Sequence, residues 1–381
     1  MKTQQLHLRG PGVPAAAFDA LRAMAPDLVL CFGDPAFFRG TSLHAALRAA
    51  APGATLAGCS GAGEIARAQV HDGSLAVTAI RFERAQARGT CTTLSDMAES
   101  FDAGSRLGTG LPAEGLRHVL VFGTGVHING SALVEGLQST LPAAARISGG
   151  LAGDNGAFVE TFTLGDNGSA GDQLVAVGLY GDALAVANSS FGGWVPFGPA
   201  RRVTRCQHNV LYELDGDRAL NVYKRYLGDY ASGLPASGLL FPFELLRDSQ
   251  HSSGIIRTIL GVDDEAGSLT LAGDVPEGGY LKLMHSSTER LIDAAEQAAL
   301  KLQPLSRGHA GPALALLVSC VGRKLVMGDR VDEEVEAVVN ALGADAVVTG
   351  FYSYGEICAS EFVGDCRLHN QTMTITWLAE T

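Results

Sequence analysis

The sequence has no apolar segment of the kind that enters or crosses a membrane. No run reaches the ~18–20 consecutive apolar residues that a transmembrane helix needs. The N-terminal stretch MKTQQLHLRGPGVPAAAF also lacks the apolar core of a signal peptide. Basic residues are few, and the formal net charge of −12 repels nucleic-acid phosphates. We therefore expect a cytoplasmic protein that binds neither a membrane nor nucleic acid.

The cysteines and histidines form no pattern typical of a disulfide framework or a metal site. The seven cysteines are odd in number and scattered, and none belongs to a C-x-x-C pair, which favours a reducing compartment. No H-E-x-x-H or comparable ligand spacing occurs, and most of the ten histidines are isolated. The sequence therefore predicts no metal site and no cofactor.

Nucleotide-binding and catalytic motifs are missing as well. The Gly-rich stretch GTGVHING fits neither a Walker A loop nor the dinucleotide fingerprint G-x-G-x-x-G. Ser60 lies in GCSGA, where the last glycine of the nucleophile motif G-x-S-x-G is out of register. Cys59 and Cys320 each end an apolar run, but a thiol nucleophile needs a neighbouring histidine or a lowered pKa. We expect a protein that is not an enzyme, with a cysteine-dependent enzyme as an alternative.

Glycine, in contrast, is abundant at 48 residues, and it marks a motif that occurs twice. The stretches GCSGAGEI at 58–65 and GFYSYGEI at 350–357 both contain Gly, four residues, then Gly-Glu-Ile, and both follow an apolar run. A strand that ends in such a turn presents backbone N–H groups and a carboxylate at a fixed point. The motif predicts either a site for a small polar ligand or a tight turn whose glutamate faces water.

Three segments of the chain repeat one order of elements: strand, Gly-bearing loop, helix, strand, Gly-acid turn and further strand. In the first segment the order is a strand at 28–34, a helix at 41–50, a strand at 54–58 and a hairpin around His71-Asp72-Gly73. In the second it is strands at 118–123, 145–150 and 173–181 with a helix at 131–140. In the third it is strands at 313–320, 345–350 and 372–379 with an exit loop at 321–323 and a helix at 331–342. These repeats predict a mixed α/β fold: two domains of mixed β-sheets covered by helices, with internally repeated units.

Composition suggests where the domains begin and end. Residues 1–27 are expected to be a lead-in with a short helix at 15–24, and the Gly- and Pro-rich stretch at 192–200 is expected to be a linker. We therefore predict one domain at 28–200 and another at 201–381. The second domain is expected to open with a strand at 211–215 and a helix at 218–227.

The candidate ligand-binding residues lie in the Gly-acid turns and at the polar ends of the adjoining strands. Carboxylates there could pair with a ligand ammonium or hydroxyl, and an arginine could hold a carboxylate in bidentate fashion. Tyrosines supply an apolar wall with a polar tip, and an asparagine both donates and accepts. The predicted set is Ser60, Glu64, Asp154, Arg323, Tyr352, Tyr354, Glu356 and Asn370. For Arg323, an ion pair with a nearby carboxylate is the alternative interpretation.

The order of several motifs resembles one known family. The stretches GCSGAGEI, ISGGLAGDNG, GGWVPFGP followed by VTR, LYELDGDRAL, SCVGR, GFYSYGEI and HNQTM together are similar to FIST proteins, which have an N-terminal and a C-terminal FIST domain. The resemblance covers nearly the whole chain from about Leu28. It implies a sensory, ligand-binding role in bacterial signal transduction, with amino acids or related small molecules as proposed ligands.

The resemblance also implies partners and one alternative. Family members often occur beside histidine kinases, cyclic-di-nucleotide enzymes such as diguanylate cyclases and phosphodiesterases, or chemoreceptors, so the output is expected to pass through a separate protein. One branch resembles haem-binding nitric-oxide sensors, so haem stays an alternative ligand. We expect the ligand to change the arrangement of the domains about residues 192–199.

Overall fold

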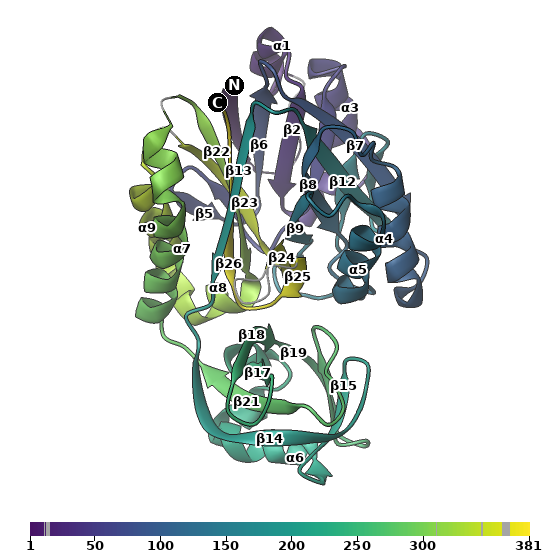
Figure 1. The fold of residues 1–381 in the computed structure, drawn as a ribbon, viewed down its shortest axis with the longest axis vertical. Helices are drawn as coiled ribbons and strands as arrows, with labels where there is room; N and C mark the ends of the chain where they lie inside the picture. Colours follow the sequence, from purple (N-terminus) through teal and green to yellow (C-terminus); the bar gives the residue numbers. More distant parts are fainter. Residues whose placement is uncertain (11, 13–15, 310, 344–345, 360–365) are drawn as a thin grey trace.

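The computed structural model describes residues 1–10, 12, 16–309, 311–343, 346–359 and 366–381. It confirms the predicted class, since the chain is 28% helical and 43% strand in several mixed sheets. Figure 1 shows a large body that contains both chain ends and a smaller one below it. We call residues 1–191 with 286–381 the main body and residues 195–285 the small body; residues 192–194 are the junction.

Three six-stranded sheets with the same strand order make up the main body. Sheet one runs β1 (Lys2–Arg9), β6 (Ser74–Arg81), β2 (Leu28–Gly33), β3 (Thr55–Ser60), β10 (Thr163–Gly165) and β11 (Gly168–Ala170). Sheet two runs β7 (Gln86–Thr93), β12 (Gln173–Tyr180), β8 (Leu116–Gly123), β9 (Arg146–Leu151), β24 (Gly355–Ala359) and β25 (Cys366–His369). Sheet three runs β13 (Leu184–Phe191), β26 (Met373–Glu380), β22 (Ala313–Cys320), β23 (Ala346–Ser353), β4 (Glu64–Ala66) and β5 (Gln69–His71). In each sheet the third and fourth strands are parallel and the other pairs are antiparallel.

Each sheet is completed by a hairpin from another repeat. The hairpin β4–β5 pairs with β23, the hairpin β10–β11 pairs with β3, and the hairpin β24–β25 pairs with β9. The predicted hairpin around Asp72-Gly73 is therefore wrong, because β5 and β6 lie in different sheets. Strand β6 has β1 on one edge and β2 on the other, so neither edge is free for β5.

The expected lead-in is a full strand. Strand β1 pairs with β6 along its whole length, from Lys2 opposite Arg81 to Arg9 opposite Ser74. Leu6 and Leu8 are two residues apart and therefore project from the same face, where they pack on a hydrophobic cluster. The helix expected at 15–24 is α1 (Asp19–Met24), while Ala15 lies outside the described residues.

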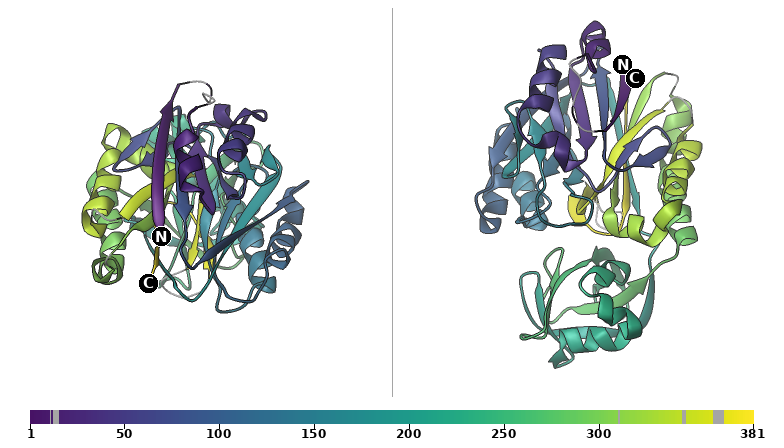
Figure 2. Two further views of the ribbon diagram at one scale, coloured as in Figure 1. Left: turned by 90° about the horizontal axis from the view of Figure 1, so that it is seen from above. Right: turned by 180° about the vertical axis from the view of Figure 1, so that it is seen from behind.

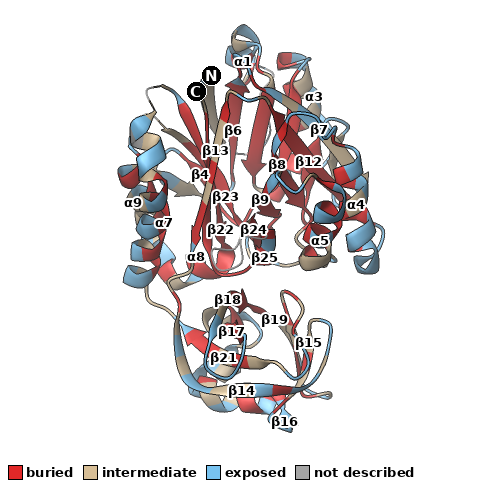
Figure 3. Cartoon of the chain, in the orientation of Figure 1, coloured by how far each residue is buried: buried red, intermediate tan, exposed pale blue. Residues whose placement is uncertain are grey.

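A central apolar core lies between the inner faces of the three sheets. Leu28, Leu30 and Phe32 of β2 point into it, whereas Val29 and Cys31 belong to a cluster on the outer face. The same alternation occurs in β8 and β22, so these strands are buried on both sides (Figure 3). This explains why their sequences are continuously apolar instead of alternating.

Helices cover the outer faces of the sheets, as Figure 1 shows. They are α1, α2 (Pro35–Phe38) and α3 (Ser42–Ala50) on sheet one; α4 (Ser100–Thr109) and α5 (Gly130–Thr140), preceded by η1 (Met97–Glu99), on sheet two; and α7 (Thr288–Gly308), α8 (Val321–Met327), η4 (Gly328–Arg330) and α9 (Asp332–Leu342) on the side of sheet three. Helices α3, α5 and α9 correspond to the helices predicted at 41–50, 131–140 and 331–342. Residues 321–323 start α8, so the exit loop expected there is wrong: β22 leads directly into a helix.

The small body is inserted between β13 and α7, so the chain enters and leaves it on the same side (Figure 2). It contains β14 (Val195–Gln207), β15 (Val210–Leu214), β16 (Asp217–Arg218), α6 (Ala219–Leu227), η2 (Gly228–Gly233), η3 (Ala236–Leu240), β17 (Phe243–Leu246), β18 (Ser252–Arg257), β19 (Ile259–Asp263), β20 (Ser268–Leu271) and β21 (Tyr280–His285). These strands surround their own apolar core. The linker expected at 192–200 is shorter, because Val195 already begins β14.

The predicted domain boundary at residue 200 stays a prediction about the sequence. In space, strands on both sides of that boundary share sheets: β13 pairs with β26, and β4 pairs with β23. A single cut in the sequence therefore cannot separate the main body from the small body.

Candidate functional site

The recurring Gly-Glu motif has a packing role that the structure explains. Gly58 on β3 lies so close to the neighbouring strand that a Cβ there would be 1.8 Å from the carbonyl oxygen of Cys31. Gly149 on β9 would meet Val121 at 1.9 Å, and Gly350 on β23 would meet Leu317 at 1.8 Å. These three glycines hold equivalent positions in the three sheets, and each allows the parallel strands to approach.

The three turns that follow these glycines are joined to one another in a ring of backbone hydrogen bonds. The N–H of Ala62 donates to the carbonyl of Tyr352 at 2.8 Å, and that of Gly153 donates to Ser60 at 2.9 Å. The N–H of Tyr354 donates to Leu151 at 3.1 Å, which closes the ring. The backbone N–H groups that a ligand was expected to use are therefore engaged within the protein at these positions.

The two glutamates of the motif are buried, so the interpretation that they face water is wrong. Glu64 accepts hydrogen bonds from the N–H and hydroxyl of Ser74 at 3.1 and 2.7 Å. Glu356 accepts from the N–H and hydroxyl of Thr372, both at 3.0 Å, and from the Ser353 hydroxyl at 2.6 Å. Ser74 begins β6 and Thr372 precedes β26. Glu64 therefore fixes the start of β6, and Glu356 fixes the start of β26.

Burial shifts the pKa of both carboxyls towards neutral pH. It raises the pKa of Glu64 to about 8 and that of Glu356 to about 7, against an ordinary value of 4.5. Hydrogen bonds from Ser74, Ser353 and Thr372 act in the opposite direction but do not outweigh the loss of hydration. Both glutamates are therefore neutral or only partly ionised near neutrality, which weakens them as partners for a ligand ammonium.

A pH dependence of stability follows. Because the folded pKa values of Glu64 and Glu356 lie above the unfolded value, their contribution is complete below about pH 4.5 and is lost as the pH rises towards 8. We expect the free energy of unfolding, measured in urea between pH 5 and 9, to fall between about pH 5 and 8. Glu64→Gln, which cannot ionise, should reduce that fall by roughly 4 kcal/mol, at about 1.4 kcal/mol per pH unit.

The control for this prediction is Glu265→Gln, which changes an exposed glutamate in the same way. It should leave the fall between pH 5 and 8 unchanged. Burial lowers the pKa of His118 to about 3 and that of His369 to about 4. These histidines therefore destabilise the fold as the pH falls below 6.5, whereas the glutamates destabilise it as the pH rises. A fall between pH 5 and 8 that is the same in Glu64→Gln as in the parent would contradict the assignment.

Asp154 and Tyr354 come together at the second turn. The Tyr354 hydroxyl donates to the Asp154 carboxylate, which also accepts from the backbone N–H groups of Phe158, Val159 and Glu160. The rings of Phe158 and Tyr354 stack with centroids 4.1 Å apart. Tyr354 lines a cavity of about 240 Å³ between α5 and the small body. Of the predicted residues, Tyr354 is the one that reaches a described cavity.

Ser60 and the two cysteines are internal. The Ser60 hydroxyl donates to the carbonyl of Gly153 at 2.7 Å and accepts from the N–H of Phe162 at 2.9 Å. Cys59 and Cys320 are buried, and the loss of hydration raises the pKa of both thiols. A thiol in such a setting holds its proton at neutral pH, which weighs against either cysteine as a nucleophile.

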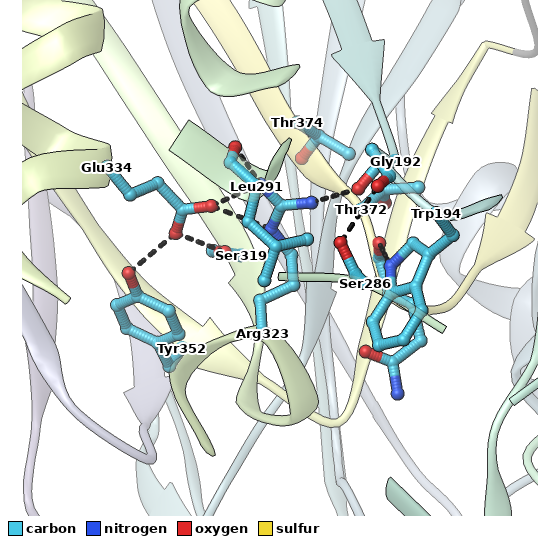
Figure 4. A network of polar contacts seen from close by, with 12 residues as sticks. Gly192, Trp194, Ser286, Leu291, Ser319, Arg323, Glu334, Tyr352, Thr372 and Thr374 are labelled. Carbon is cyan, nitrogen blue, oxygen red and sulfur yellow. Dashed lines mark hydrogen bonds and ion pairs between the residues drawn. The ribbon is translucent and has the colours of Figure 1, made fainter. Parts of the chain in front are cut away.

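Arg323 lies at the centre of a buried network, shown in Figure 4. Its guanidinium forms an ion pair with Glu334 of α9, with Nε 2.7 Å from Oε1. The other carboxylate oxygen accepts from the hydroxyls of Tyr352 at 2.7 Å and Ser319 at 3.0 Å. The ion-pair alternative for Arg323 is therefore what the structure shows.

Glu334 was not among the predicted residues, although its position carried a signal. It lies four residues before Val338 in α9, and therefore on the apolar stripe of that helix. An acidic residue on a buried stripe needs a cationic or hydrogen-bonding partner. Tyr352, predicted as a ligand wall, supplies such a partner instead, and burial raises its pKa well above 10.

Arg323 also holds the junction. One guanidinium nitrogen donates to the carbonyl of Gly192, and another donates to Leu291 at 2.9 Å. The Ser286 hydroxyl donates to the carbonyl of Gly193 at 2.8 Å, and the Trp194 indole N–H donates to the carbonyl of Gln371 at 2.8 Å. Each of the three junction residues is thus held by a hydrogen bond to a residue of the main body.

A cavity of about 190 Å³ adjoins this junction, and both bodies line it. The main body contributes His369 and Thr372 and the end of β13, while the small body contributes Glu244, Ile256 and Met284 from three strands. Its full lining is Ser190, Phe191, Gly192, Gly193, Trp194, Glu244, Gly254, Ile256, Met284, His369 and Thr372. The cavity therefore lies where a bound molecule would touch both bodies at once.

The segment His369 to Thr372 beside this cavity concentrates polar atoms without partners. His369 Nε2, both amide atoms of Asn370 and Gln371 Oε1 are buried and make no hydrogen bond within the described chain. Gln371 also has a positive φ of 64°, which is uncommon for a residue with a side chain. Buried polar atoms without partners are costly, and their concentration together with an uncommon backbone conformation is typical of a functional site.

The predicted residue Asn370 belongs to this segment, although its side chain does not line the described cavity. Its neighbours His369 and Thr372 do, and they were not predicted. Gln371 Nε2 donates to the carbonyl of Leu239 in η3 at 2.9 Å, which ties the segment to the small body. The motif HNQTM in the sequence marks this place without showing that it faces a cavity.

His369 has an unpaired, buried ring nitrogen beside the cavity. A hydrogen bond to the backbone of Cys358 raises its pKa slightly, but burial and the guanidinium of Arg257 lower it to about 4. Because Nε2 is the nitrogen without a partner, the proton lies on Nδ1 and Nε2 keeps its lone pair. The imidazole is therefore neutral at physiological pH.

A neutral imidazole with a free nitrogen could in principle ligate haem iron, but this cavity does not fit the group. Its volume of about 190 Å³ is below the ~300–1,000 Å³ typical of pockets for drug-sized ligands. Within the described ranges, no group of three or more His, Cys, Asp or Glu side chains could hold a metal ion. Nor is any helix among them long and apolar enough to cross a membrane.

The fold and the site define a mixed α/β protein with a cavity between a main body and an inserted small body. The FIST N domain model matches residues 27–217 and the FIST C domain model matches residues 219–359. The chain belongs to the FIST family, as its motifs predicted. FIST domains are associated with small-ligand sensing in signalling proteins.

The individual proteins that are similar to this chain include an archaeal protein and a hydrolase of known structure. An uncharacterized protein of Methanocaldococcus jannaschii is 26% identical over 263 residues, which cover 62% of this chain and 48% of that protein. The chain thus spans about half the length of this relative. The crystal structure of a cyanuric acid hydrolase from A. caulinodans aligns over 99% of both chains with 11% identity and a TM-score of 0.36, too low to support a shared function.

Proposed function

We propose that this protein is a cytoplasmic sensor that binds a small molecule in the cavity beside the junction and signals to a separate protein. One observation carries the proposal: the cavity is lined by residues of the main body, the small body and the junction together. A ligand there contacts both bodies, so its affinity depends on how they are arranged. That dependence is what a ligand needs in order to shift a conformational equilibrium.

The hydrogen bonds around the junction give the shift a route. On one side of residues 192–194 lies the cavity, and on the other side Arg323 donates to Gly192 and is paired with Glu334. Movement of the junction therefore changes the partners of a buried ion pair. We propose that the altered surface is recognised by a histidine kinase, a diguanylate cyclase or phosphodiesterase, or a chemoreceptor.

The protein is proposed to bind its ligand without converting it. Ser60, Cys59 and Cys320, the candidate nucleophiles, are buried in internal hydrogen bonds or apolar surroundings, and none of them lines the cavity beside the junction. The residues that do line it include no serine, cysteine or lysine paired with a base by a described hydrogen bond. Conversion of the bound molecule into a product would overturn this part of the proposal.

Trp194 provides the test. It lines the cavity and donates its indole N–H to Gln371, whereas Trp377 is in β26. In a Trp377→Phe variant, a ligand bound in the cavity should change the emission of Trp194. At 100 times its Kd, the ligand should also raise the free energy of unfolding by about 2.7 kcal/mol.

The measurement pairs fluorescence with thermal unfolding across a set of small metabolites. Trp194→Phe, with Trp377 retained, is the matched control and should lose the fluorescence change. A metabolite that stabilises the protein while the emission of Trp194 and the solution scattering stay constant would place binding elsewhere and reject the junction mechanism.

A further inference from the structure

We propose that the cavity beside the junction selects a small organic amine: a cationic N–H donor on a short apolar body. The proposal rests on the function proposed above, because it names the ligand class of the same cavity. It differs from the amino-acid ligand that the family resemblance implies, since an amino acid brings a carboxylate as well as an ammonium group.

One carboxylate lines the cavity from the small body. Glu244 of β17 accepts from the Ser252 hydroxyl through Oε1, and Oε2 has no hydrogen bond within the described chain. His369 of β25 lines the cavity from the main body as a neutral imidazole, and its unpaired Nε2 is buried. A protonated amine has up to three N–H donors in a compact head, which matches the free oxygen of the carboxylate.

The negative charge of Glu244 is not neutralised by the protein. No cation among the described residues forms an ion pair with it, including Lys282, which lies directly opposite on β21. A carboxylate that is largely removed from solvent and lacks a cationic partner is costly, and a ligand ammonium would remove that cost.

The remaining wall fits the carbon part of an amine. Trp194, Ile256 and Met284 are buried apolar residues that pack in one cluster beside the cavity, and Phe191 lies at its edge. An indole ring also attracts a cation to its face. The volume of about 190 Å³ suits a molecule of a few heavy atoms.

Carboxylate ligands find no counter-charge in this cavity. None of its eleven lining residues is lysine or arginine. Arg257 acts on His369 electrostatically, but its N–H groups donate to the backbone carbonyls of Asp274, Ile256 and Leu368, and it lines a different cavity. A bound carboxylate would face Glu244 without a partner, and like charges in such a site repel each other.

A divalent metal ion is a weaker match for this cavity. Glu244 and His369 could supply two ligands at most, and the described residues contain no group of three or more metal-ligating side chains. Structural zinc sites use four ligands, and catalytic ones use three protein ligands. An ammonium needs only the carboxylate and the apolar wall.

Three probes of matched shape test the charge preference: butylamine, butanol and butyrate, titrated at pH 7.5 into the Trp377→Phe protein with Trp194 emission and calorimetry as readouts. We expect saturable binding of butylamine that is at least tenfold tighter than that of butanol, and no binding of butyrate. Glu244→Gln should weaken butylamine binding at least tenfold. Glu265→Gln, the same change at an exposed position of the small body, should leave it unchanged.

The outcomes separate this proposal from the sensor function. Equal binding of all three probes, tighter binding of butyrate, or retained butylamine binding in a folded Glu244→Gln protein would overturn the amine proposal. If a carboxylate or neutral metabolite binds and changes Trp194 emission, the sensor function stands and the ligand class is wrong. Saturable binding of zinc that depends on Glu244 and His369 and excludes butylamine would identify a metal site instead.

Discussion

Arg323→Met should lower the free energy of unfolding by roughly 3–5 kcal/mol. The substitution keeps most of the side-chain volume but leaves the Glu334 carboxylate buried without its cationic partner. It also removes donors from the carbonyls of Gly192 and Leu291. Urea unfolding at pH 7 measures the loss.

Two further variants show whether charge or packing causes this loss. Arg323→Met combined with Glu334→Gln should be more stable than Arg323→Met alone, because Gln leaves no unpaired charge and can still accept from Tyr352 and Ser319. Arg330→Met breaks ion pairs with Glu289 and Glu333 at the surface and should change stability little. If Arg323→Met were as mild as Arg330→Met, the network would not stabilise the fold.

Gly149→Ala is expected to be at least as damaging, with a loss of more than about 4 kcal/mol or no folded protein. The added methyl would lie 1.9 Å from the carbonyl oxygen of Val121, and the φ of Gly149 is 140°, a conformation that residues with side chains rarely adopt. The obstacle is backbone of a paired strand, so it cannot move without breaking the ladder. Circular dichroism and urea unfolding of the purified variant measure the effect.

Gly53→Ala is the matched control. Gly53 lies in the turn between α3 and β3, and no atom would approach an added Cβ there within 4 Å. Its stability should be unchanged or slightly higher, because alanine restricts the unfolded chain more than glycine does. A Gly149→Ala protein as stable as Gly53→Ala would show that the strands can separate without penalty.

The repeated units could be predicted because their signals are local. Apolar runs such as 28–34, 118–123 and 313–320 are strands buried on both faces, and the helices after them carry apolar stripes. The exchange of hairpins could not be predicted, because it joins residues far apart in the sequence. Glu64 pairs with Phe351, and Leu151 pairs with Gly355, and neither pairing leaves a mark near the residues concerned.

The candidate site was predicted in part for a similar reason. The Gly-acid turns are recognisable in sequence, but whether Glu64 and Glu356 face water, a ligand or a strand depends on what packs over them. For Arg323, the alternative interpretation predicted an ion pair with a carboxylate, and the structure shows one with Glu334. Glu244 had no signal of its own, and His369 was marked only as part of the motif HNQTM, because a glutamate in β17 and a histidine in β25 line one cavity only when the two bodies meet.

The exchange of hairpins affects how the chain can fold while it is being synthesised. A chain under synthesis exposes the edge of β3 until residues 163–165 emerge, and the edge of β9 until residues 355–357 emerge. Hairpin β4–β5 is made early, yet its place beside β23 exists only after residue 353 has been added. The nascent protein therefore carries open strand edges through most of its translation, and such edges invite pairing with other chains. Speed of elongation and protection by chaperones should matter more for this fold than for one whose sheets are completed by neighbours in sequence.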